Sequence, residues 1–363
     1  MTVTYHSGER IQGTQADFDG SPAISGGWKE LDRVTVGAGQ TSVNLDVTSL
    51  NYKRYYMILH NHITDGTSMR VGIKFNGDDA TPYSYAETRN QGSNPRVDDN
   101  TNTGGSELNV TNALNTAEDW FGVAYLANKA DRNKLYLSNY VGQNATGVNN
   151  APNRVVLSGK WTKGTDAVNQ ITASRITGSG VADSGSELIV LGYDPDDTHT
   201  DNFWTLLKDA SGSGTSFNTG TFTAKKYLWI QVFYKATGGG LNASLRVGNN
   251  TISTSNYAYS TSQNGANEDT TTSGQGQIVL DSGTTDSGEI GFANIFVVNN
   301  ANKEKLFNIN QVSQIGAISI APNRRETVAK WVDNNQINIV GLHDAGTGGN
   351  FTSSSFIKVW GSD

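Results

Sequence analysis

Four aspartates stand close together near the middle of the 363-residue chain: Asp194, Asp196, Asp197 and Asp201. Clustered carboxylates in a loop are the ligands that hard cations such as Ca²⁺ prefer. The segment lacks the glycine and the closing glutamate of an EF-hand loop, and a polar stretch with one proline is typical of a boundary between domains. We therefore expect a solvated linker over residues 195–201 and no cofactor, with a Ca²⁺ site at the four aspartates as the alternative.

Histidine and cysteine chemistry is sparse in this sequence. The chain has 5 His and no Cys, which excludes disulfides, thiolate metal sites and Cys nucleophiles. His60 and His62 lie on one face of a predicted strand, because side chains alternate with a period of two. No third metal ligand is identifiable, so we expect both histidines to be structural.

Signatures of known catalytic sites are also missing. The sequence contains no Gly-x-Ser-x-Gly elbow, no His-Glu-x-x-His motif and no Walker-type loop. We therefore expect no enzymatic activity. A polysaccharide-degrading enzyme that uses a glycosidase-type pair of carboxylates is the alternative.

Aromatic residues are the side chains best suited to bind a ligand here, with 7 Trp, 14 Tyr and 12 Phe. Amphipathic rings at the loops of a β-sandwich can stack on the apolar faces of sugars. Trp120 has no partner elsewhere in the sequence, and Tyr83 and Tyr193 border loops. These three residues are our candidates for stacking on a ligand.

The elements that must position these residues occur twice. Ala151-Pro152-Asn153-Arg154 recurs as Ala321-Pro322-Asn323-Arg324, and a Lys-Trp pair follows six residues after each arginine. Further segments match in the same order at similar offsets, among them Lys134-Leu135 with Lys305-Leu306. We predict structural roles for the residues that match between the two copies, namely Trp28 with Trp204, Pro152 with Pro322, Arg154 with Arg324, and Trp161 with Trp331.

Alternation of polar and apolar residues dominates both copies, and about seven or eight short strands can be counted in each. Strands of this number joined by Gly-, Asn- and Ser-rich loops predict an all-β chain of two tandem, internally duplicated β-sandwich modules that are jelly-roll-like. The predicted parts are an N-terminal arm (1–23), module 1 (24–194), the linker (195–201) and module 2 (202–363).

Charge and hydropathy exclude several partners. The net charge is −7, and no basic stripe is present to neutralise phosphates, so we expect no nucleic-acid binding. No run of apolar residues reaches 18, so we expect no membrane span. The first residues lack an apolar segment of the kind that signal peptides carry, so we expect no secretory signal.

Several segments resemble virion structural proteins of marine tailed viruses: 7–14, Asp17-Phe18, Trp28-Lys29-Glu30-Leu31, 53–57, 74–78 and 357–363. The resemblance implies a β-rich virion surface component, either a decoration or cement protein on the capsid or a tail or fibre part, and it carries over no catalytic residue. We therefore expect its partners to be copies of itself and other virion proteins, with the copies assembled as a symmetric homo-oligomer such as a trimer.

Two other functions stay open at this point. A double-jelly-roll major capsid protein would use the two modules to form pseudo-sixfold trimers. A carbohydrate-binding adhesin or receptor-binding protein would use exposed Trp or Tyr rings to hold surface glycans.

Overall fold

The computed structural model describes residues 24–25, 27–46, 54–91, 94–111, 118–194, 198–199, 201–264, 269–281, 288–314, 321–346 and 348–363. Every regular element in these ranges is a β-strand. The predicted N-terminal arm over 1–23 lies outside the described residues, as do residues 195–197 and 200 of the predicted linker.

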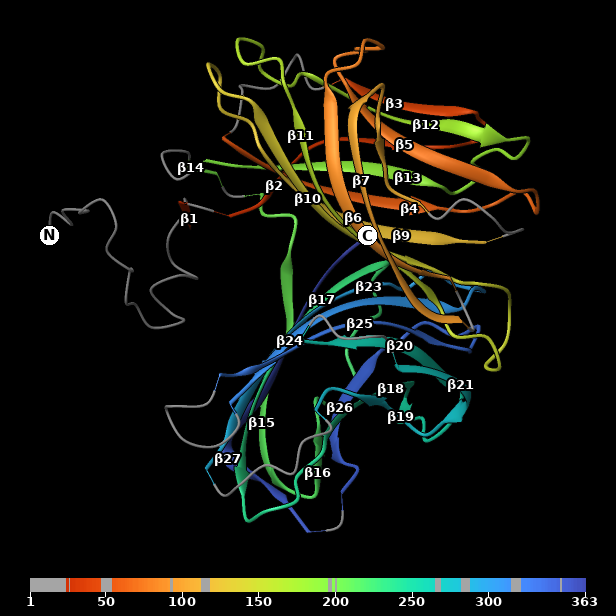
Figure 1. Cartoon of the computed structure of the whole chain (residues 1–363). Helices are drawn as coiled ribbons and strands as arrows, with labels where there is room; N and C mark the ends of the chain where they lie inside the picture. Colours follow the sequence, from red (N-terminus) through yellow and green to blue (C-terminus); the bar gives the residue numbers. More distant parts are fainter. Residues whose placement is uncertain are drawn as a thin grey trace, which may run out of the picture.

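The first sandwich consists of two antiparallel sheets, one large and one small (Figure 1). The large sheet has eight strands in the order β2 (Lys29–Thr35), β13 (Glu187–Tyr193), β4 (Tyr55–His62), β9 (Trp120–Ala127), β10 (Lys134–Gly142), β11 (Asn153–Trp161), β6 (Tyr83–Gln91) and β7 (Asn94–Gly105). The small sheet has the order β3 (Ser42–Asp46), β12 (Gln170–Gly178), β5 (Met69–Phe75) and β8 (Leu108–Asn109).

The second sandwich repeats this plan. Its large sheet has the order β15 (Thr205–Gly214), β27 (Asn350–Ser362), β17 (Tyr227–Thr237), β23 (Ile290–Val298), β24 (Lys305–Ser313), β25 (Asn323–Trp331), β20 (Tyr257–Gln263) and β21 (Asp269–Gln275). Its small sheet contains β16 (Ser216–Asn218), β26 (Ile339–Asp344), β18 (Ala243–Asn249) and β19 (Thr251–Ile252), and β22 (Ile278–Val279) also pairs with β18. A separate two-stranded sheet joins β1 (Ile24–Ser25) to β14 (Thr198–His199) in the predicted linker.

The strand order identifies a jelly roll in each sandwich. In the first, β2, β13, β4 and β9 form one four-stranded layer, and β3, β12, β5 and β8 form the facing layer. Successive strands of this set cross from one layer to the other in the Greek-key manner of jelly rolls. The hairpins β6–β7 and β10–β11 are additions that widen one layer to eight strands. The prediction of two tandem, duplicated, jelly-roll-like modules is confirmed.

Matched tryptophans fill corresponding places in the two cores. Trp161 in β11 and Trp331 in β25 are 1 % and 2 % exposed. Each lies directly opposite a buried tyrosine of the neighbouring strand, Tyr83 for Trp161 and Tyr257 for Trp331. The predicted structural role of the Trp161 and Trp331 pair therefore agrees with where their side chains lie.

A buried lysine begins the fifth strand of each large sheet. Lys134 Nζ donates to Arg132 O at 2.6 Å and to Lys163 O at 3.5 Å. Lys305 Nζ donates to Lys303 O, and to Asp333 O at 3.0 Å. Burial lowers the pKa of Lys134, and lowers the pKa of Lys305 to about 8. Each ammonium thus holds the loop before its own strand against the loop that follows the neighbouring strand.

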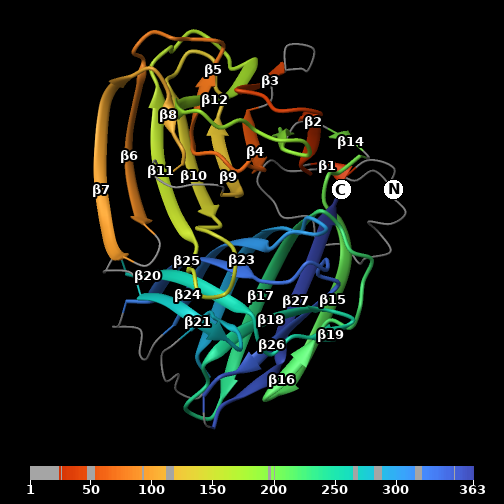
Figure 2. The ribbon, with the colours of Figure 1, turned by 90° about the vertical axis from the view of Figure 1, so that its right-hand side faces the viewer.

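The two large sheets pack on each other through their outer faces, which forms a third apolar cluster between the modules. Figure 2 shows β9, β10 and β11 of the first module standing on β23, β24 and β25 of the second. The first module contributes Met57, Leu59, Phe121, Val123, Val141, Ile189 and Leu191. The second module and the segment before it contribute Phe203, Trp204, Tyr227, Phe296, Val298, Leu306 and Val328.

Candidate functional site

Two of the three predicted ligand-stacking residues are buried. Tyr83 is fully buried, and its hydroxyl lies 2.7 Å from the backbone N of Phe75, which donates to it. Trp120 is 4 % exposed and packs in the core of the first module. Both belong to strands and point inward under the two-residue alternation. Neither ring can stack on an external ligand, so this prediction was wrong for Tyr83 and Trp120.

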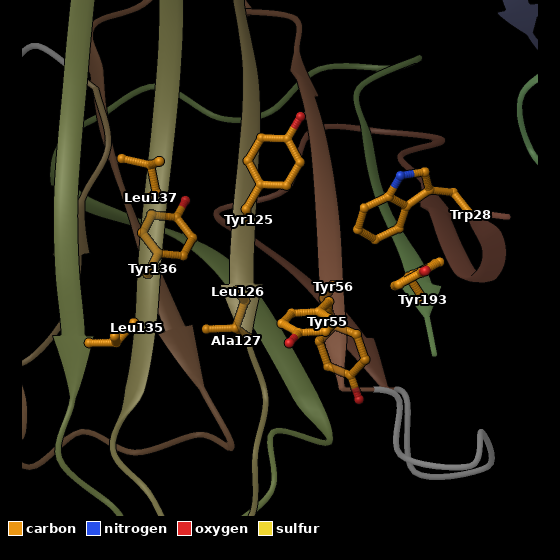
Figure 3. A pocket seen from close by; sticks show the side chains of 10 residues that line it. All are labelled: Trp28, Tyr55, Tyr56, Tyr125, Leu126, Ala127, Leu135, Tyr136, Leu137 and Tyr193. Carbon is orange, nitrogen blue, oxygen red and sulfur yellow. The ribbon is translucent and has the colours of Figure 1, made fainter. Parts of the chain in front are cut away.

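The third candidate, Tyr193, lines an open groove of about 410 Å³ on the outer face of the first large sheet (Figure 3). Its ring centroid lies 5.6 Å from that of Trp28 and 6.2 Å from that of Tyr55. We call this surface the aromatic groove and define it by the residues that line it: Trp28, Tyr55, Tyr56, Tyr125, Leu126, Ala127, Leu135, Tyr136, Leu137 and Tyr193.

The aromatic groove is apolar and exposed. Tyr55, Leu135 and Leu137 are 47 %, 61 % and 49 % exposed. Burial raises the pKa of Tyr125 to about 12, so its phenol stays neutral. Among the described residues that line the groove, none has a charged side chain. Such a surface matches the core of a protein–protein contact better than a sugar site, which needs convergent hydrogen-bonding groups beside its aromatic rings.

A second exposed apolar surface crosses the large sheet of the second module. Phe356, Phe233, Phe292 and Val312 are directly opposed neighbours on β27, β17, β23 and β24. The rings of Phe233 and Phe356 stack with centroids 5.4 Å apart. Phe292 and Val312 are 37 % and 42 % exposed. We call these four residues the phenylalanine row.

The aromatic groove corresponds to the part of the second module that the first module covers. Strand register matches Tyr55 with Tyr227 and Leu135 with Leu306. Tyr227 and Leu306 are 1 % and 2 % exposed because the junction between the modules buries them. Equivalent positions are therefore covered in the second module and open in the first.

The phenylalanine row shows the reverse relation. Phe292 matches Phe121, and Val312 matches Val141, at the same register in the two sheets. Phe121 and Val141 are at most 1 % exposed and belong to the cluster at the junction. Here the position is covered in the first module and open in the second.

Polar contacts fix the orientation of the junction. Tyr227 Oη donates to Glu187 Oε2 at 2.6 Å, and Lys226 Nζ lies 2.9 Å from the same oxygen. These partners keep the pKa of Glu187 below its usual value despite its burial. Arg154 Nη1 also crosses the junction, to Glu326 Oε2 at 3.0 Å.

The other matched residues differ in burial between the two copies, because in a pair such as Arg154 and Arg324 only one member crosses the junction. Arg154 is 1 % exposed, whereas Arg324 is exposed on the surface of the second module. Pro152 is buried and Pro322 is exposed. Trp204 lies in the junction, with its ring 5.9 Å from Trp229. Its counterpart Trp28 forms one wall of the aromatic groove, as Figure 3 shows.

Two of the four aspartates of the predicted Ca²⁺ alternative are described, and both lie beside cations. Asp194 Oδ2 is 3.8 Å from Arg54 Nε, and Asp201 Oδ2 is 3.2 Å from Lys29 Nζ. Asp196 and Asp197 lie outside the described residues. In the part of the chain that the structure describes, no group of three or more His, Asp and Glu side chains is placed to hold a metal ion.

His60 and His62 are buried in the first module, with ring centroids 6.0 Å apart. Burial, together with the charge on His62, lowers the pKa of His60 to about 3, and burial lowers the pKa of His62 to about 4. The His60 ring is neutral, and its Nδ1 lies 3.4 Å from the hydroxyl oxygen of Tyr140.

Leu135, Leu137, Phe292 and Val312 were not among the sequence-based candidates, although the sequence held a signal for the first two. In the segment Lys134–Leu137, apolar side chains occupy positions on both faces of the strand. A strand that is apolar on both faces needs a cover on each face. Such runs outside a parallel sheet mark a surface that packs against something beyond its own sandwich.

A comparison with protein-family models found no match, and a comparison with curated proteins found none. No helix that could span a membrane is present among the described residues.

Proposed function

We propose that this protein is a structural component of a virion surface that works through protein–protein assembly, as a decoration or cement protein. The observation that supports it best is the placement of exposed apolar side chains. Seven large apolar residues in the described ranges are more than a third exposed, and all seven lie on strands of the two large sheets. Soluble monomers rarely present such continuous apolar patches unless a partner covers them.

The jelly-roll fold is compatible with this proposal. Jelly rolls recur in viral capsid proteins, in lectins and in cupins, so the function must be argued from the site. Two jelly rolls in one chain also suit a shell-forming subunit. A double-jelly-roll major capsid protein is therefore the second form of this proposal.

Glycan binding is the candidate from a different class. The rings of Trp28, Tyr55 and Tyr193 in the aromatic groove favour it, because such rings can stack on sugars. The scarcity of polar groups in the groove speaks for a protein partner instead. A glycan array with the native chain and a Tyr193→Ala variant separates the two: binding that the variant loses supports the adhesin.

Mass spectrometry and labelled electron microscopy of density-purified particles from the source test the proposal. We expect the chain to co-purify with particles and antibody label to lie on their outer surface. Finding the chain only in the cell fraction would overturn the virion role. The number of copies per particle distinguishes a major capsid protein from a decoration protein. A major capsid protein is the most abundant protein of the particle, whereas a decoration protein is bound on top of a shell that another protein forms.

A further inference from the structure

We propose that the aromatic groove of one copy receives the phenylalanine row of a second copy, so that chains join head to tail. This inference rests on the proposed assembly function and names the partner and the contact. It is carried by the junction between the two modules, which already shows how one of these jelly rolls binds another.

The internal junction is not symmetric. In a twofold contact, equivalent residues on the two sides would be buried together. Instead Phe121 is 1 % exposed while its counterpart Phe292 is 37 % exposed, and Tyr227 is 1 % exposed while its counterpart Tyr55 is 47 % exposed. One region of the first large sheet thus binds a different region of the second.

An asymmetric contact between two copies of a module leaves one unused surface of each kind. In the first module, the junction covers the region around Phe121 and leaves the region around Tyr55 exposed, which is the aromatic groove. In the second module, the junction covers the region around Tyr227 and leaves the region around Phe292 exposed, which is the phenylalanine row. The two free surfaces therefore occupy the positions of the two sides of a contact that the chain already makes. Beside the row, Gln231, Asn294 and Lys358 stand where the internal contact has the apolar Leu59, Val123 and Ile189.

The chemistry of the free surfaces agrees with this assignment. Tyr55 matches Tyr227 in residue type and Leu135 matches Leu306, so the receiving surface is retained. On the inserting side, Phe292 and Val312 repeat Phe121 and Val141. At the edge of the row, Phe356 replaces the ionic Glu187, which removes a charge that would otherwise need a partner.

The internal junction also predicts which residues meet. Phe121 packs on Tyr227 with ring centroids 6.2 Å apart, and Asn308 Nδ2 donates to Phe121 O at 3.2 Å. The matched residue of Asn308 in the first module is Leu137. Between copies, Phe292 should accordingly lie against Tyr55 and Leu137.

Repeating an asymmetric contact joins copies into a ring when the rotation closes and into an open chain when it does not. A groove-to-groove dimer would instead be symmetric and would leave the phenylalanine row exposed. An N-terminal arm that covers the groove would leave the protein monomeric.

The test uses the full-length chain in sedimentation-velocity centrifugation over a range of concentrations, with two single variants. Leu135→Asp places a charge in the groove, and Phe292→Asp places one in the row. Each should weaken self-association by roughly 30-fold or more, as for a central interface residue. The control Leu206→Asp changes another exposed apolar residue of the second large sheet, 41 % exposed and outside both surfaces, and should associate like the native chain.

Mixing the two variants gives the decisive result. Leu135→Asp retains an intact row and Phe292→Asp retains an intact groove, so a mixture should form one-to-one dimers that stop growing. Near-ultraviolet circular dichroism establishes that each variant is folded. A native chain that stays monomeric, a Phe292→Asp variant that associates normally, or a mixture that fails to form dimers would each overturn the proposal.

Cysteine pairing supplies an independent readout, because the native chain has no Cys. Phe292→Cys and Leu137→Cys chains, mixed and oxidised, should form a cross-linked dimer, while Phe292→Cys mixed with Leu206→Cys should not. Equal cross-linking in both mixtures would contradict the head-to-tail contact. Particle composition is measured separately, so a protein that joins head to tail but is absent from particles would refute the virion role and leave this contact standing.

Discussion

Arg154 Nη1 lies 3.0 Å from Glu326 Oε2, so the first copy of a repeated Ala-Pro-Asn-Arg motif binds a carboxylate of the other module. Arg324, from the second copy of the motif, approaches the other oxygen of the same carboxylate at 3.8 Å between Nε and Oε1. One glutamate thus receives both repeated arginines, one buried and one exposed. The difference in burial makes the two arginines a natural test pair.

We expect Arg154→Ala to lower the free energy of unfolding by about 3 kcal/mol, because it removes the buried partner of a carboxylate and opens the junction. Arg324→Ala is the matched control. The side chain of Arg324 is 61 % exposed, so this variant should lose less than about 1 kcal/mol of unfolding free energy. Denaturant titration followed by tryptophan fluorescence measures both, and equal losses would contradict a special role for the buried pair.

The hydroxyls of Tyr83 and Tyr257 hold corresponding strand ends in the two modules. Tyr83 Oη accepts from Phe75 N at 2.7 Å, and Tyr257 Oη accepts from Val247 N at 2.8 Å. Tyr83→Phe and Tyr257→Phe should each cost about 1–3 kcal/mol, since a buried backbone N–H loses its acceptor. Tyr85→Phe, whose hydroxyl lies in an exposed contact with Asn102, should cost much less. Thermal unfolding of the three variants ranks them, and a neutral Tyr83→Phe would refute the assignment.

Buried His60 and His62 should make the first module sensitive to acid. Their folded pKa values of about 3 and about 4 lie below the ordinary 6.5, so the unfolded chain binds protons first as the pH falls. Each histidine then removes stability at about 1.4 kcal/mol per pH unit below 6.5, until the folded pKa is reached. His60→Val installs the residue that the second module has at this position, Val232.

We expect unfolding free energies measured at pH 7 and pH 5 to differ less in His60→Val than in the native chain. Titrating carboxylates affect both proteins alike, so the comparison isolates the histidine. An unchanged difference between the two pH values would show that His60 is protonated in the folded state.

Removal of divalent cations should leave the melting temperature unchanged. The described carboxylates of the predicted Ca²⁺ alternative, Asp194 and Asp201, already lie beside Arg54 and Lys29. Differential scanning calorimetry with a chelator and with added Ca²⁺ measures the effect. A clear stabilisation by Ca²⁺ that Asp194→Asn abolishes would establish the metal site instead.

The fold was predictable because the sequence carries two direct signals of it, the alternation of polar and apolar residues and the internal repeat. Alternation sets which face of each strand is buried, and the repeated Ala-Pro-Asn-Arg and Lys-Trp segments show that one plan is used twice. The same alternation could have excluded Tyr83 and Trp120 as ligand residues, had their strand positions been known. Tyr193 borders a loop because it ends its strand, and its ring lines the aromatic groove.

A strand that is apolar on both faces, such as Lys134–Leu137, marks a surface that needs a cover, but which of these surfaces stays exposed was not predictable in this way. Tyr55 and Tyr227 have the same residue type at the same position of equivalent strands, yet one is 47 % exposed and the other 1 %. Their difference arises from how one module docks on the other, and no pattern within a single module encodes that docking.

Lys134 and Lys305 do for their loops what a bound calcium ion does in many extracellular β-proteins, since each gathers carbonyl oxygens from two separate segments around one positive charge. An ion of this kind can be diluted away, chelated or exchanged. An ammonium group on a covalent tether cannot. The cation at these loops is therefore part of the chain, and its presence does not depend on the mineral content of the surrounding medium.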